Sequence, residues 1–379
     1  MTSVLLDIRQ GPEAIAWSTI VAGISLLERA IRLAGVCGAE RVFVLAIDGE
    51  AGLEQALAAS VGRVTPERIT SLSSVSGRML VLDVWTVYER AAIKDLLGVE
   101  GSLTLNLSKG RAWVTYSSYL QSPSTEEMSQ RWAVEVREPA DIKRAESRLW
   151  QDCRKPLDGI VSRHLNRYVS LWISARLARL PIHPNQISIV TFSLGILAGI
   201  LASMGGYWGF FWAGVVFQIN SIVDGCDGEL ARVKYEFSVK GEWLDTISDD
   251  LSDVFFWAGL GLGAWHSYDS SLDGTWWLWL AAISVVFKGV SMFLYYTWLY
   301  ARGRGDLLAF TWSFDSADES SSLLTRVLKV LKYTTKKDFI VFAAMVLGFF
   351  GLQPWLLLAA APGNLIVAIS VILERRKAN

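Results

Sequence analysis

The hydrophobic pattern divides the chain into two parts of different character. In residues 1–140, short apolar runs alternate with amphipathic stretches. Apolar runs of about four to eight residues predict buried strands, and a 3.6-residue apolar period predicts helices. Strands are therefore expected at Val4–Ile8, Arg41–Ile47 and Met79–Val84, and helices at Ile24–Leu33 and Leu53–Val61. This alternation predicts a soluble α/β domain with a mostly parallel sheet covered on both faces.

Long apolar segments dominate the chain after residue 183. They are expected near 185–204, 207–223, 243–265, 275–300, 338–351 and 353–373. A helix needs ~20 residues to cross the ~30 Å hydrocarbon layer of a bilayer. Several of these segments have that length, so the sequence predicts an all-α six-helix transmembrane domain over residues 183–379.

The charges of the connecting loops agree with six spans. Gly205–Gly206 and Gly351–Gln353 carry no charge, and His266–Thr275 contains two Asp but no Lys or Arg. The other connections and the C-terminal tail hold the basic residues Arg232, Lys234, Lys240, Arg302, Arg304, Arg326, Lys329, Lys332, Lys336, Lys337, Arg375, Arg376 and Lys377. The positive-inside rule places this side and both termini in the cytoplasm. We expect a protein of the inner or cell membrane, and no signal peptide is recognised.

Residues 141–182 form a basic amphipathic juxtamembrane segment. Its arginines are spaced among large apolar residues, as in VSRHLNRYVSLWISARLARL. Such a helix next to a span is typical of the lipid interface. The arginines either attract lipid headgroups or contribute to the mouth of a site, and the sequence leaves both readings open.

Composition narrows the classes of function. Hydrophobic residues make up 52% of the chain and 17 are Trp, which is typical of aromatic belts at membrane interfaces. The net charge of −1 gives no global field for nucleic acid. The three cysteines have no metal-ligand or disulfide spacing, so neither a zinc site nor a disulfide framework is expected.

One segment carries a pattern that points to chemistry, DGCDGELARVKYEFSVKGEWLDTISD at 224–249. On a helix, Asp224, Asp227, Gly228, Ala231 and Arg232 share one face. On a second helix, Gly241, Asp245 and Asp249 share another face. Two helix ends therefore present four carboxylates.

Clustered carboxylates repel one another strongly in a low-dielectric setting, and acidic residues within membranes are expensive and usually functional. Hard oxygen ligands favour Mg²⁺ or Mn²⁺, and four Asp suffice for two divalent cations that suit displacement at phosphorus. Small residues on the same faces admit a bulky ligand, and Arg232 suits a diphosphate. For any single Asp, a helix cap or a solvated loop charge is an equally good interpretation. The whole set in helical phase favours the metal site.

The segment resembles the CDP-alcohol phosphotransferase family, whose pattern is DxxDGxxARx₈GxxxDxxxD. Every fixed position matches, and HPNQIS at 183–188 is similar to the usual start of the family's first span. The resemblance implies six transmembrane helices around a polar cavity, often in a homodimer, and release of CMP. It implies Asp224, Asp227, Asp245 and Asp249 as metal ligands, with Asp249 also the general base. It implies CDP contacts from Gly228, Ala231, Arg232, Gly241 and Asn185.

The front part resembles sugar-phosphate nucleotidyltransferases through AGISLLERAIRLAGVCGAERVFVLAID. The fusion, with KPLDGIVSRHLNR at 155–167, is similar to bifunctional inositol-phosphate cytidylyltransferase and di-myo-inositol-phosphate-phosphate synthase proteins. However, RQGPEAIAWSTIV after the first strand has one Gly and no Lys, and Asp83 is out of register for a catalytic metal ligand. We therefore expect a degenerate, non-catalytic front domain that serves as a scaffold, dimer contact or regulator.

Cationic residues are candidates for binding a phosphorylated acceptor. They are Lys288 within the fourth span, Arg302 and Arg304 after it, and Arg163 in the juxtamembrane segment. A lysine within a span is a functional candidate, although snorkelling or pairing with an Asp also accounts for it. The family often has Arg directly after its last Asp, where this chain has Asp250, and Asp253 continues the same helix face.

The leading hypothesis is metal-dependent transfer of a substituted phosphate from a CDP-linked donor to an alcohol, with inositol phosphate as the favoured acceptor. A phospholipid synthase that uses CDP-diacylglycerol is the alternative within the family. A catalytically inactive membrane scaffold is the alternative of another class. A cation transporter is disfavoured, because it would not need the Gly, Ala and Arg spacing.

Overall fold

The computed structural model describes two compact units. The residues described are 3–9, 11–59, 63–71, 79–98, 103–108, 111–116, 131–154, 158–268, 273–303 and 336–378. The first unit comprises Met1–Cys153, Ala175–Pro181 and Leu230–Glu236. The second comprises Arg154–Ser174, Ile182–Glu229 and Phe237–Asn379.

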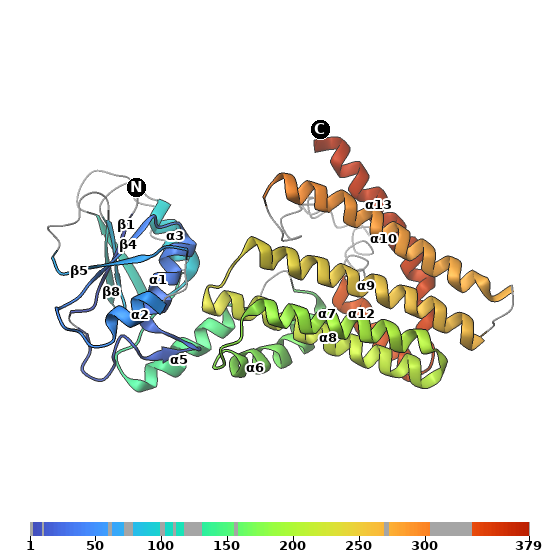
Figure 1. Ribbon diagram of the computed structural model, residues 1–379, viewed down its shortest axis with the longest axis horizontal. Coiled ribbons are helices and arrows are strands. Elements are labelled where there is room, and N and C mark those ends of the chain that lie inside the picture. The colour runs from blue at the N-terminus through green and yellow to red at the C-terminus, as the bar shows by residue number, and fades with distance from the viewer. Residues whose placement is uncertain are drawn as a thin grey trace, which may run out of the picture. The chain divides into compact units, whose positions relative to one another are not determined.

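A six-stranded sheet forms the centre of the first unit (Figure 1). Its order is β5 (Pro66–Ile69), β4 (Arg41–Leu45), β1 (Ser3–Asp7), β6 (Met79–Asp83), β8 (Leu103–Ser108) and β9 (Arg111–Tyr116). Neighbouring strands are parallel except β8 and β9, which are antiparallel. Two small ribbons pair β2 (Ile20–Val21) with β3 (Ile24–Ser25) and β7 (Thr86–Tyr88) with β10 (Ala133–Glu135). The predicted α/β character and the three predicted strands are confirmed.

The first unit also contains the helices α1 (Leu26–Cys37), α2 (Leu53–Ala59), α3 (Arg90–Gly98) and α5 (Pro139–Gln151). Helices α1 and α2 lie where the apolar period predicted them, and α1 packs on β4, whereas α5 packs on β2 and β10 of the small ribbons. Helix α1 begins two residues after the predicted start at Ile24, because Ser25 caps it by accepting a hydrogen bond from the Glu28 amide at 3.1 Å. The helix is followed by Gly38, which has a φ of 100°, a left-handed conformation that residues with a side chain rarely adopt.

The carboxyl ends of β1 and β6 lie side by side at the point where the strand order reverses, which is where open α/β sheets bind ligands. Here that place is filled by the buried side chain of Trp85, whose Nε1 donates to the Ile15 carbonyl at 2.9 Å. A Cβ on Gly11 would lie 2.1 Å from the Trp85 ring, so the loop after β1 rests directly on the indole.

The two carboxylates at these strand ends, Asp7 and Asp83, accept hydrogen bonds from other side chains. Arg9 bonds to Asp7 at 2.7 and 2.9 Å, and this hydrogen bonding lowers the pKa of Asp7. Asp83 accepts from Arg137 at 2.6 Å and from Thr86 at 2.8 Å. Both carboxylates are thus engaged by other side chains of the same unit.

The second unit is helical. Its elements are the π-helix Ser162–Asn166, α6 (Arg167–Leu177, whose last residues belong to the first unit), α7 (Pro184–Met204), α8 (Gly206–Lys234), α9 (Val239–Tyr268), α10 (Trp276–Ala301), α12 (Lys337–Phe349) and α13 (Leu357–Ala378). Short 3₁₀ turns at Asp273–Thr275 and Gln353–Leu356 precede α10 and α13. The predicted basic connection at 304–335 lies outside the described residues.

Three helical segments among the described residues are long and apolar enough to cross a membrane: Pro184–Met204, Trp276–Ala301 and Gln353–Leu373. Helices also occupy the other predicted spans. Helix α8 extends beyond the expected end at 223, and α9 begins before the expected start at 243. Helix α8 continues to Lys234 and stops at Tyr235, whose φ of 55° is left-handed. All four motif aspartates thus lie on helical backbone, and the count of six spans remains a prediction.

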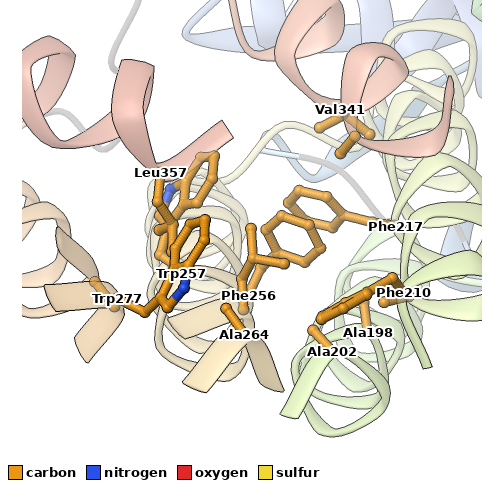
Figure 2. Close-up of a cluster of buried hydrophobic side chains, with 14 residues drawn as sticks. Ala198, Ala202, Phe210, Phe217, Phe256, Trp257, Ala264, Trp277, Val341 and Leu357 are labelled. Atoms are coloured by element: carbon orange, nitrogen blue, oxygen red, sulfur yellow. The ribbon is translucent and has the colours of Figure 1, made fainter. Parts of the chain in front are cut away.

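A cluster of buried apolar side chains joins the helices of this unit (Figure 2). Phe217 of α8 and Phe256 of α9 stack with ring centroids 4.1 Å apart. Val341 of α12 and Leu357 of α13 complete the cluster from the C-terminal helices. Aromatic stacking adds to the gain from apolar burial, so this core fixes α8 against α9 beside the acidic motif.

Helices α7 and α9 are in direct backbone contact. A Cβ on Gly259 would lie 2.0 Å from the Gly199 carbonyl oxygen, and one on Gly263 would lie 1.9 Å from the Ala202 oxygen. Small residues of this kind let helices within membranes approach closely. The contact sets the start of α7 against the start of α9, where Gly241 and Asp245 lie.

Candidate active site

Three of the four motif aspartates converge. Asp224 of α8 and Asp245 and Asp249 of α9 each offer a carboxylate oxygen within 4.8 Å of the others. All three are half-buried. The spacing of one turn between Asp245 and Asp249 puts both on the face of α9 that meets α8.

Asp227 lies one turn beyond Asp224 and is more enclosed. Its side chain accepts a hydrogen bond from Ser188 of α7 at 2.7 Å and another from the Gly228 amide. Its carboxyl group also interacts with that of Asp245. Asp227 therefore joins three helices at the edge of the cluster.

Lys337, the first residue of α12, is the cation next to the cluster. Its Nζ lies 2.9 Å from Asp249 Oδ1 and 3.4 Å from Asp253 Oδ1. From the sequence, Lys337 was counted only among the basic loop residues. The pair Lys336–Lys337 at the start of a span was the available signal, but it does not separate this role from a positive-inside charge.

Lys288, predicted to bind an acceptor, lies between two carboxylates. Its Nζ is 2.7 Å from Asp250 Oδ1 and 2.9 Å from Asp253 Oδ2. Asp250 also accepts hydrogen bonds from Tyr295 and Tyr296. Asp253 pairs with both Lys288 and Lys337. Lysine and aspartate side chains therefore alternate in a chain of ion pairs from Lys288, in the middle of α10, to Asp249.

Two residues expected to contact CDP lie against each other. A Cβ on Gly241 would be 2.9 Å from Asn185 Oδ1. Asn185 lies in the first turn of α7. Its backbone amide donates a hydrogen bond to Nδ1 of the capping residue His183 at 3.2 Å. A side chain at position 241 would therefore displace the Asn185 amide group from the start of α9.

The remaining motif residues follow on α8. Gly228 lies one turn after Asp224, and Ala231 and Arg232 lie in the last turns of the helix, which belong to the first unit. The Nε of Arg232 is buried and has no hydrogen-bond partner among the described residues. A guanidinium with an unused donor fits the expected role toward a diphosphate.

A pocket opens on the other side of Asp224. Its lining residues are Ser162, Asn166, Arg167, Ser170, Ser221, Ile222, Asp224, Gly225, Lys337 and Asp338. They come from the π-helix, α6, α8 and the start of α12. Three serines and one asparagine supply hydroxyl and amide groups, two residues are cations and two are carboxylates, so the pocket suits a small polar ligand.

The other cations proposed for an acceptor are not gathered at this pocket. Arg163 is exposed on the π-helix. Arg302 is exposed just after α10, with its guanidinium 3.7 Å from the centroid of the Trp298 ring. Arg304 lies outside the described residues.

The chemistry of the donors fits divalent cations. The cluster consists of carboxylate oxygens only, the ligand type that Mg²⁺ and Mn²⁺ take. Among the described side chains, Asp249 forms an ion pair with Lys337 at 2.9 Å. The excess of negative charge among the described side chains leaves a place for cations.

Comparison with known proteins agrees with this site. Residues 181–374 match the CDP-alcohol phosphatidyltransferase family, which covers half of the chain. A bifunctional IPC transferase and DIPP synthase of Aquifex aeolicus is 36% identical over 150 residues, 39% of this chain and 34% of the relative. One of Thermococcus kodakarensis is 40% identical over 125 residues, 33% of this chain and 28% of the relative.

A shorter relative matches as well. The archaetidylinositol phosphate synthase of Pyrococcus horikoshii is 36% identical over 97 residues, 26% of this chain and 50% of that protein. The matches thus span about a third to a half of these relatives' own lengths. The family match covers the described aspartate cluster and all of the helices from α7 to α13 that surround it. The chain therefore belongs to the CDP-alcohol phosphatidyltransferase family.

Proposed function

We propose that the chain transfers a substituted phosphate from a CDP-linked donor to an alcohol, with release of CMP, and that it needs divalent cations. The observation that carries this is the convergence of Asp224, Asp245 and Asp249 from two helices. Neither a scaffold nor a cation transporter needs the Gly, Ala and Arg positions that accompany the aspartates on the same helices.

The donor is assigned to the side of the cluster formed by the starts of α7 and α9 and by α8. Asn185 and Gly241 lie close together there. Gly228 has no side chain and Ala231 has a small one, so both leave space along the surface of α8. Arg232 supplies a guanidinium with a free donor among the described residues. In this proposal Asn185, Gly228 and Gly241 contact the cytidine diphosphate moiety, and Ala231 and Arg232 are assigned to it by their positions in the motif.

Asp249 is assigned as the general base, because an alcohol is a weak nucleophile until its proton is removed. The acceptor hydroxyl gives its proton to the Asp249 carboxylate while its oxygen bonds to the phosphorus that carries the donor's substituent. The bond between that phosphorus and the CMP oxygen breaks, and CMP leaves with the bonding electrons. Lys337 orients Asp249 through the contact at 2.9 Å.

Asp224, Asp227, Asp245 and Asp249 would hold two divalent cations, Mg²⁺ or Mn²⁺. Bound cations of this kind offset negative charge on phosphoryl oxygens and on the leaving group. Without cations the carboxylates repel one another, and Ser188 orients Asp227 by donating a hydrogen bond to its carboxylate at 2.7 Å.

The favoured acceptor is an inositol phosphate. The relatives carry names that include DIPP synthase and archaetidylinositol phosphate synthase. The polar pocket beside Asp224, with Lys337 in its lining, suits a phosphorylated polyol. The second candidate is a phospholipid synthase with CDP-diacylglycerol as the donor, which the archaetidylinositol name favours.

We further assign six spans to residues 183–379, with the basic connections and both termini in the cytoplasm, and a homodimeric assembly. The boundaries proposed are a front domain at 1–140 and an amphipathic juxtamembrane segment at 141–182. Helices in the six segments and the one-sided distribution of basic residues support the topology.

The test of this function is CMP release by the purified protein. We expect CMP with Mg²⁺ or Mn²⁺, inositol 1-phosphate and a CDP-linked donor, and none after chelation with EDTA. CDP-diacylglycerol and a soluble CDP-polyol should be compared as donors, and free inositol should replace its phosphate as an acceptor control. Absence of CMP with every donor and acceptor would leave the inactive scaffold as the better reading.

The front unit is proposed to be non-catalytic, because Trp85 fills the ligand position of its sheet and Asp83 is engaged by Arg137. We expect that the full chain given CTP, Mg²⁺ and inositol 1-phosphate releases no pyrophosphate. Inorganic pyrophosphatase coupled to phosphate detection measures this. Production of a CDP-polyol under these conditions would contradict the assignment.

A further inference from the structure

Glu229 is a buried acid that the mechanism above does not use. It occupies a variable position of the motif, two residues after Asp227, and its side chain is completely buried. Its carboxylate accepts hydrogen bonds from Arg167 Nη1 at 2.7 Å, Ser170 Oγ at 2.7 Å and Ser174 Oγ at 2.6 Å. All three donors lie on α6, so one side chain of α8 binds three turns of the juxtamembrane helix.

Arg167 completes this group of side chains. It also donates to both carboxylate oxygens of Asp158 at 2.9 Å. Burial alone would lower the pKa of Arg167, but its hydrogen bonds to Asp158 and Glu229 raise it, so the guanidinium stays charged. A buried acid with a charged partner and two hydroxyl donors is well satisfied, whereas loss of one partner leaves a buried charge uncompensated.

Helix α6 is polar on the side that faces the protein. Asn166 before it, together with Arg167, Ser170 and Ser174, is buried, while Tyr168 and Trp172 are exposed. An exposed apolar face on such a helix suits the lipid interface. The fully buried residues of α6 are thus polar, and they contact α8 through hydrogen bonds and an ion pair.

The contact between α6 and α8 is close and lies beside the cluster. A Cβ on Gly225 would lie 3.3 Å from Arg167 Nη1. Asn166 is tied to α8 as well, since its Oδ1 accepts from Gln218 at 2.8 Å. Ser170 and Arg167 line the same pocket as Asp224, so the position of α6 sets the width of that pocket.

We infer that Glu229 is a positioning residue that locks α6 onto α8 and so forms the wall of the acceptor pocket opposite Asp224. The acceptor role of this pocket rests on the proposed function, but the locking of α6 does not. Glu229 acts through Arg167, Ser170 and Ser174 and touches neither donor nor acceptor.

Cys226 gives a direct measure of this lock. Its thiol is buried where α8 meets α6, 3.6 Å from the Ser170 carbonyl oxygen. A buried thiol reacts with N-ethylmaleimide only when its surroundings open. In a Cys37→Ser/Cys153→Ser background, Cys226 is the single cysteine, and intact mass measures its labelling without any substrate.

Glu229→Gln is the test variant, and Asp158→Asn is the matched control. Both remove a carboxylate from Arg167, but only Glu229 belongs to α8. We expect Glu229→Gln to label Cys226 at least about tenfold faster than the parent, and Asp158→Asn to stay within about twofold. Equal protection of Cys226 in Glu229→Gln and the parent would overturn the lock.

Kinetics then separate the lock from a general loss of fold. We expect Glu229→Gln to raise the KM for inositol 1-phosphate by about tenfold, with the KM for the CDP-linked donor nearly unchanged. A lower kcat with both KM values unchanged would contradict a role of Glu229 in forming the wall of the acceptor pocket. If the parent protein releases no CMP at all, the proposed function fails, while the labelling of Cys226 still decides whether Glu229 locks α6.

Discussion

Replacement of Asp249 by Asn is expected to lower CMP release by about 10²–10⁴-fold, since an amide cannot take the acceptor's proton. The side chain keeps its size, so its contact with Lys337 is weakened rather than replaced by a cavity. Binding of CDP, measured by isothermal titration calorimetry in Mn²⁺, should fall far less than turnover. Turnover close to the parent value would remove Asp249 from the role of base.

The control for this variant is Glu242→Gln. Glu242 lies on the same helix, α9, in its first turn, and it is outside the aspartate cluster. It undergoes the same change from carboxylate to amide at the same end of the helix. We expect its CMP release to stay within about twofold of the parent, because Glu242 contributes no carboxylate to the cluster.

Replacement of Asp224 by Asn is expected to weaken metal binding by at least about a hundredfold, because it removes a ligand from the centre of the three-carboxylate group. The amide keeps one oxygen but loses the negative charge. Electron paramagnetic resonance of free Mn²⁺ measures the binding directly and does not depend on the identity of the donor or acceptor.

CMP release by the Asp224→Asn variant should fall together with its affinity for Mn²⁺. We expect Asp224→Asn to need far more Mn²⁺ for half-maximal CMP release, with a lower maximum. Ser221→Ala, one turn earlier on α8 and also in the pocket lining, removes a polar group without removing a charge. If both variants bind Mn²⁺ as the parent does, the cluster is not the metal site.

The motif itself could be predicted in full because it is local. Spacings of three and four residues put Asp224 beside Asp227 and Asp245 beside Asp249 on any helix. Three strands of the front unit, β1, β4 and β6, were predicted for the same reason, since a short apolar run can be recognised without knowledge of its partner strand. The start of α1 was misplaced by two residues, because the cap at Ser25 outweighed the apolar period.

Residues that depend on distant partners could not be predicted. Glu229 and Arg167 are 62 residues apart, and Lys337 is 88 residues from Asp249. Each looked like a motif spacer or a loop charge until the helices were packed. Trp85 is similar, since the missing Gly and Lys residues predicted a degenerate front unit but not that an indole would occupy its ligand position.

The backbone contact between α7 and α9 has a consequence for how specificity can diverge among related chains. With Gly259 against the Gly199 carbonyl, the two helices meet backbone to backbone at this point, and a larger residue at either glycine would push them apart. The distance from Asn185 to Gly241 is then fixed, and any enlargement on that side would have to separate two helices at once. The opposite pocket has walls of serine, asparagine and lysine on α6, α8 and α12, where single substitutions change shape and charge. Selection for a new alcohol is therefore expected to act on α6 and α12, while the nucleotide side stays constant.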